Sequence, residues 1–223
     1  GWISSRFIVE KAAMPSAPVL ARPVLAVLLL LLAPMASADD DRYENPTLQF
    51  ALTKPSTWHF MSAQENRKNL ERVQFGSDAF KQQVVEQSAA PLVVITRYPE
   101  PHPGLNASLK VSVKPFGALP TREPLPLLSM ILPVMQQQLD SVEIVQPPAE
   151  TTVAGLPAAH VVLHYTLATT DGDAFATASE LWLVPNGDFF YMIGAGYAQG
   201  DADTRAEIAK VVEELTIARP ASP

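Results

Sequence analysis

The sequence predicts an α+β domain in which one antiparallel β-sheet carries helices on both faces. Three strand-like segments, 158–169, 174–184 and 188–197, are joined by Asp171-Gly172 and Asn186-Gly187. Such dipeptides between apolar runs are strong signals of β-hairpins. Large apolar residues occupy both alternating sets of positions in these strands, so both faces of the sheet must be covered.

Two-residue turns at both dipeptides would fix the register of the three strands. One face then carries His160, Val162, His164, Leu181, Leu183, Phe190 and Met192. The other face carries Val161, Leu163, Tyr165, Glu180, Trp182, Tyr191 and Ile193. Apolar positions at helical spacing predict helices over 78–87, 124–140 and 203–214, which would cover these faces. Further strands are predicted over 48–52, over 58–60 after a turn at Pro55, over 92–98, 108–116 and 215–218, and from Val142.

The N-terminal residues have the pattern of an exported protein. Residues 1–13 do not begin with methionine, and we interpret them as upstream sequence from a mis-assigned start. Residues 14–38 match a secretory signal peptide, with Arg22, an apolar run over 24–33 and small residues that end at Ala38. Ten apolar residues are too few to span a bilayer, which needs about 20. The sequence therefore predicts cleavage after Ala38.

Cleavage would leave residues 39–223 as a single domain in the periplasm or outside the cell, with no permanent membrane anchor. The chain has 16 basic and 23 acidic residues; the first 38 contain three and one of these, so 13 and 22 remain, a net charge of −9. This charge argues against nucleic acid as a partner. The chain has no cysteine, which excludes disulfides, thiolate nucleophiles and zinc–thiolate sites.

The spacing of His160 and His164 would suit a metal-ligand pair on a helix, but both lie on a predicted strand. Residues four apart on a strand are about 13 Å apart, at roughly 3.3 Å per residue. One metal ion, with bonds to histidine of about 2 Å, does not reach both. We therefore predict no metal site.

Glu180 is the one charged residue among the large apolar side chains of its predicted face. Buried there, it would have a raised pKa and could form a site. In the alternative interpretation it lies at an end position where the carboxylate reaches water or Tyr165. The candidate ligand-binding residues are Glu180, Trp182 and Tyr165.

No catalytic motif is present: there is no GxSxG, HExxH, phosphate-binding glycine loop or EF-hand pattern. We predict no catalytic residue and no cofactor. Gly194 and Gly196 lie on a predicted strand, where a bulge or close packing explains them. The proline-rich loops 99–104 and 116–126 are the expected contact surfaces.

Three segments together resemble the PsbP-like fold: YENPTLQFALTKPSTW (43–58), LLSMILPVMQQQL (127–139) and VAGLPAAHVVLHY (153–165). That fold occurs in an extrinsic photosystem II protein, a Ran-binding nuclear import factor and exported bacterial proteins. The resemblance implies an α/β/α sandwich over 43–218. No metal, Ran or photosystem contact residue of the family matches a position here. Members act as accessory or adaptor proteins without catalysis, which implies such a role by analogy.

We therefore expect an exported, non-catalytic accessory or binding domain of the bacterial envelope, with another envelope protein as its partner. One alternative is a carrier of a small ligand or cation, which would use the aromatic residues Trp58, Trp182 and Tyr191 or the negative charge. A second is an enzyme in which Glu180 or a histidine acts as acid or base.

Overall fold

The structure is a computed structural model that describes residues 38–88 and 91–219. A short 3₁₀ helix, η1 (Ala38–Asp41), comes first, and a compact unit begins at Asp41. The predicted upstream segment 1–13 and nearly all of the predicted signal peptide 14–38 lie outside the described residues.

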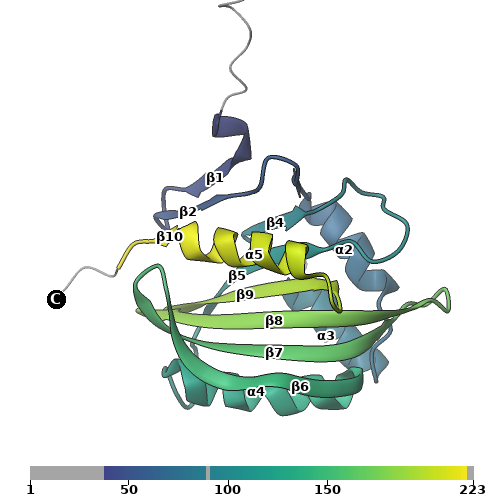
Figure 1. The fold of residues 1–223 in the computed structure, drawn as a ribbon. Helices are drawn as coiled ribbons and strands as arrows, with labels where there is room; N and C mark the ends of the chain where they lie inside the picture. The colour runs from purple at the N-terminus through teal and green to yellow at the C-terminus, as the bar shows by residue number, and fades with distance from the viewer. Residues whose placement is uncertain (1–37, 89–90, 220–223) are drawn as a thin grey trace, which may run out of the picture. The chain divides into compact units, whose positions relative to one another are not determined.

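Two antiparallel sheets make up the β-structure of this unit (Figure 1). The larger has seven strands in the order β3-β4-β5-β9-β8-β7-β6. These are β3 (His59–Phe60), β4 (Val93–Thr96), β5 (Ser108–Pro115), β6 (Asp140–Val153), β7 (Leu156–Ala168), β8 (Ala174–Asn186) and β9 (Phe189–Ala198). The smaller has the order β1-β2-β10, with β1 (Arg42–Asn45), β2 (Phe50–Thr53) and β10 (Thr216–Ile217).

Helices pack on both faces of the seven-stranded sheet, as predicted. They are α2 (Ala63–Arg72), α3 (Asp78–Ser88), α4 (Pro124–Gln138) and α5 (Ala202–Glu214). On one face, Leu127, Leu128 and Leu132 of α4 pack in a cluster with Val161, Leu163 and Leu183. On the other face lie α5 and the small sheet. The predicted α+β class is confirmed.

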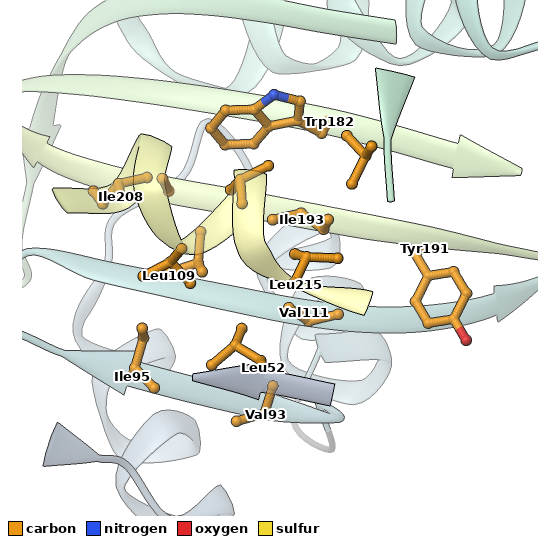
Figure 2. Packing of buried hydrophobic residues seen from close by; sticks show 14 of the residues in the cluster. Leu52, Val93, Ile95, Leu109, Val111, Trp182, Tyr191, Ile193, Ile208 and Leu215 are labelled. Carbon is orange, nitrogen blue, oxygen red and sulfur yellow. The ribbon is translucent and has the colours of Figure 1, made fainter. Parts of the chain in front are cut away.

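The cluster beneath α5 is the larger of the two (Figure 2). Ile208 and Leu215 belong to α5 and its C-cap, and they pack with Leu109 and Ile193 of the sheet. Leu52 of β2 joins the same cluster. Full burial of one such side chain contributes roughly 1.5–3 kcal/mol, so this cluster joins α5 firmly to the sheet.

The register of β7 and β8 differs from the prediction by one residue. The connection is a five-residue loop, 169–173, in which Thr169 N donates to Asp173 O. His160 therefore pairs with Trp182. A one-residue shift exchanges the faces of a strand. The predicted faces of β7 were therefore wrong: His160 shares a face with Glu180, and Tyr165 lies on the opposite face. Asn186 of β8 pairs with Phe189 of β9, so this register differs from the prediction by two residues. A two-residue shift leaves every side chain on its predicted face.

Two elements were missing or too short in the prediction. Helix α2 begins with a capping box between Ser62 and Glu65. Strand β6 has 14 residues, and its pairing with β7 shifts register three times. Among residues 38–88 and 91–219, no helix combines the length and the hydrophobicity needed to cross a bilayer.

Candidate functional site

Glu180 is buried on the α5 face, with 3% of its surface exposed. Its Oε1 lies 3.2 Å from His160 Nε2 and accepts a hydrogen bond from Arg205 Nη2, also at 3.2 Å. The indole ring of Trp182 stacks on the His160 ring at 4.6 Å. Arg205 belongs to α5 and His160 to β7, so this carboxylate joins the helix to the sheet.

The partners of Glu180 determine its charge. Burial by itself raises the pKa of Glu180, but the hydrogen bond from His160 and the charge of Arg205 outweigh it and hold the pKa below 4.5. The expectation of a raised pKa was wrong. Burial, together with the negative charge of Glu180, raises the pKa of Tyr197 to about 12. Glu180 is thus an ionised, paired carboxylate, and neither it nor Trp182 lines either of two hollows that lie elsewhere on the described part of the chain.

The first of these hollows lies on the opposite face and has a volume of about 290 Å³. We call it the α2 pocket. Strands β5, β9, β8 and β7 form its floor, α2 forms one wall, and the β4–β5 loop (97–107) forms its rim. The polar residues that line it include Asn66, Asn69, Glu100, His102, Ser108, Lys110 and Tyr165. The apolar ones include Met61, Leu70, Val94, Leu105, Leu167 and Phe175.

Two glycines of β9 leave open space on this face of the sheet, and one of them, Gly196, lines the α2 pocket. Gly194 pairs with Lys110, and Gly196 pairs with Ser108. A Cβ built on either glycine meets no atom within 4 Å. The expectation of close packing at these glycines was therefore wrong. They leave a part of the sheet without side chains, and α4 does not fill it.

Hydrogen bonds to Glu100 fix the wall and the rim. Its Oε1 accepts from Asn69 Nδ2 at 3.1 Å and from Asn106 Nδ2 at 2.9 Å. Its Oε2 accepts from the backbone N–H of His102 at 3.0 Å. At the C-terminal end of α2, the carbonyl oxygen of Arg72 accepts from Thr170 N. The last turn of α2 is thus attached both to the rim and to the 169–173 loop, which holds this wall of the α2 pocket in place.

Lys110 and Tyr165 place two ionisable groups at the floor. Burial lowers the pKa of Lys110 to about 8. Within the part of the chain that the structure describes, no carboxylate lies at ion-pair distance from its ammonium group. Burial raises the pKa of Tyr165 to about 12, so its hydroxyl group remains neutral near pH 7. The floor therefore has one cation and one neutral hydroxyl group that are available to a ligand.

A second hollow, of about 490 Å³, lies between the start of α4 and the β6–β7 hairpin. It is lined mainly by prolines and threonines, and its two carboxylates, Glu123 and Glu150, are exposed. It has no buried polar side chain that would orient a ligand, so the α2 pocket is the better candidate site.

The three predicted ligand-binding residues are separated by the sheet. Tyr165 lines the α2 pocket, whereas Glu180 and Trp182 lie together on the other face. Sequence reasoning missed Lys110, although its position between Leu109 and Val111 on an alternating strand placed it on the opposite face from both. In the described ranges, no group of three or more His, Asp or Glu side chains is placed to hold a metal ion.

No family model matches this sequence, and no curated protein matches it. Several solved structures are similar in fold. LpqN of Mycobacterium tuberculosis, described as involved in cell envelope biogenesis, is 16% identical with a TM-score of 0.50, over 77% of this chain and 84% of LpqN. This chain also spans half the length of a similar protein from Bacteroides thetaiotaomicron.

Two further similar structures have the PsbP-like fold. Cyanobacterial PsbP from Synechocystis is 12% identical with a TM-score of 0.44, over 79% of this chain and 91% of that protein. The Ran-binding protein Mog1p of Saccharomyces cerevisiae is 12% identical with a TM-score of 0.43, over 82% of this chain and 97% of Mog1p. The predicted resemblance is confirmed for the fold alone.

Proposed function

We propose that this chain is an exported, non-catalytic binding domain of the bacterial envelope, and that it holds a small ligand in the α2 pocket. The observation that carries the proposal is the open floor at Gly196, beneath a wall held by hydrogen bonds. Ligand sites are typically preformed, mostly apolar and supplied with a few polar groups. The lining of the α2 pocket has that composition.

Two features support the envelope and non-catalytic parts of the proposal. The signal-like segment 14–38 fits export, and LpqN, which shares the fold, is described as acting in envelope biogenesis. Glu100, the carboxylate of the rim, already accepts three hydrogen bonds, so it is a poor general base.

NMR spectra of the full chain, recorded with a library of small organic molecules, test this proposal. We expect hits to shift the backbone amide signals of Gly194 and Gly196. Gly196→Val would fill the floor and abolish the shift of the Gly194 signal. Gly200→Ala, in the β9–α5 turn, is unsuitable as a control because Gly200 has a positive φ of 83°. Ser129→Ala, at an exposed position of α4, is the better control and should leave the shifts unchanged. Hits that bind Gly196→Val unchanged would overturn the proposal.

A second candidate function, docking on another envelope protein, is favoured by exposed apolar side chains. Helix α4 and strand β6 expose Met130, Val134, Ile144 and Val145. Large apolar groups gathered on a surface often mark an interface. Cross-linking in the native envelope would test it: a partner captured by the natural chain should be lost in Met130→Ser/Val134→Ser and retained in Gly196→Val.

A further inference from the structure

We infer that the ligand of the α2 pocket is a small amphipathic molecule with one carboxylate group, which pairs with Lys110. The inference rests on the proposed function and adds the chemical class of the ligand. It follows from four features of the pocket: its unpaired cation, the carboxylates of its rim, its apolar lining and its size.

Lys110 is the cation at the floor of the α2 pocket. Lys110 stands on β5 opposite Gly194, and its two chain neighbours, Leu109 and Val111, point into the core beneath α5. Buried charges are normally paired, because transfer of an ion out of water is unfavourable. Lys110 is half-buried and lines the pocket, yet no carboxylate of the described chain pairs with it. An anionic ligand group would supply the missing partner.

The rim limits how much negative charge the ligand carries. Glu100 lies at the rim with both oxygens occupied by hydrogen bonds, and Asp173 lines the same pocket from the exposed 169–173 loop. Arg72 also lines it, but it is exposed and lies 3.7 Å from Asp171. One available cation facing two fixed carboxylates favours a single negative charge over a doubly charged phosphate.

Tyr165 gives the floor a second polar group, on β7, which is separated from the β5 strand of Lys110 by β9 and β8. Its hydroxyl group remains protonated up to about pH 12, so it can donate a hydrogen bond to a carboxylate oxygen. Lys110 and Tyr165 both line the floor, whereas the carboxylates lie at the rim and in the loop. This arrangement orients the ligand with its carboxylate inward.

The remaining lining and the volume describe the rest of the ligand. Leu70 of α2, Val94 of β4 and Leu167 of β7 provide apolar surface, and Phe175 adds an aromatic ring. A volume of about 290 Å³ suits a small ligand, such as one with a short acyl or arylalkyl chain.

Matched probes test the inference: 4-phenylbutyrate and its neutral amide, which have the same shape and differ in charge. Binding to the full chain is measured by calorimetry at pH 7 and mapped by NMR. A charge-assisted contact gives a preference of about tenfold or more, so we expect the acid to bind at least that much tighter than the amide. Lys110→Met should remove the preference, and Lys68→Met, on the exposed face of α2, should leave it intact.

The outcomes separate this inference from the proposed function. Acid and amide that bind equally and both shift the signals of Gly194 and Gly196 would overturn the inference and leave the proposed function standing. An acid preference that survives Lys110→Met would also overturn the inference. If neither probe, nor hexanoate as a smaller acid, moves those two signals at saturating concentration, the inference is overturned, and the library screen alone decides the proposed function.

Discussion

Each face of the seven-stranded sheet holds one charged side chain, Glu180 buried on one face and Lys110 half-buried on the other, and their surroundings differ. On the α5 face, Glu180 is paired with His160 and Arg205. On the α2 face, Lys110 has a pKa lowered to about 8 by burial, with no carboxylate partner in the described chain. Lys110 lines the α2 pocket, whereas Glu180 lines neither that pocket nor the hollow at the start of α4.

This difference separates a structural charge from a binding charge. A paired buried ion contributes to folding, because loss of its partner leaves an uncompensated charge. An unpaired ion destabilises the fold and persists where something outside the chain completes it. Substitution of Glu180 should therefore lower the stability of the fold, whereas substitution of Lys110 should raise it.

The largest effect is expected from Glu180→Gln. The loss of the carboxylate leaves His160, Arg205 and Tyr197 without their anionic partner, so the free energy of unfolding should fall by about 2–3 kcal/mol. The value lies at the low end because Arg205 is half exposed. Urea denaturation at pH 7 measures it, with the exposed Glu150→Gln as control. Equal stability of the two variants would contradict a structural role.

The same pair of proteins should respond differently to acid. The pKa of Glu180 is lowered in the folded state, so its contribution is present above the usual value of 4.5 and is lost as the pH falls through the lowered pKa. The difference in stability between the natural chain and Glu180→Gln should therefore shrink below about pH 4.5. A difference that stays constant down to pH 3 would show that the carboxylate is not the cause.

Lys110→Met should have a smaller effect of opposite sign. It removes a desolvated charge and keeps the apolar stem, so stability at pH 7 should rise by about 1 kcal/mol. The folded pKa is about 8, below that of the unfolded chain, so the natural protein gains stability as the pH rises from about 8 to 10.5. The advantage of the variant should shrink over that range. Denaturation at pH 7 and pH 10 measures this, and a destabilised variant would contradict it.

The smallest change in stability is expected from Gly196→Val. Valine favours extended backbone, and a Cβ at this position meets no atom within 4 Å, so stability should rise by about 0.5 kcal/mol or stay unchanged. Binding of 4-phenylbutyrate should nevertheless be lost. A variant that folds and still binds the acid normally would place the ligand elsewhere.

Most of the sheet could be predicted from the sequence because its signals are local. Alternating apolar positions and the glycine turns located the three C-terminal strands. Helices α4 and α5 followed from their apolar spacing. Helix α2 was missed because it is polar, although its capping box, Ser62 to Glu65, is legible in the sequence.

The candidate site could not be predicted, for two physical reasons. The 169–173 loop is longer than the two-residue turn that its Asp-Gly dipeptide suggests, and this one-residue shift moved Tyr165 to the other face of the sheet from Glu180. The α2 pocket also joins Asn69, Lys110 and Tyr165, which are far apart in the chain. The one local signal was the pair Gly194 and Gly196, which mark open space.

The most direct test of the central claim is the pKa of Lys110, followed by NMR of its Cε and Nζ signals with and without 4-phenylbutyrate. We predict a pKa of about 8 in the free protein and a rise towards the ordinary value of 10.5 when the acid binds. A value near 10.5 in the free protein, or a lowered value that the acid leaves unchanged, would contradict the claim that Lys110 is the unpaired counter-charge of a ligand.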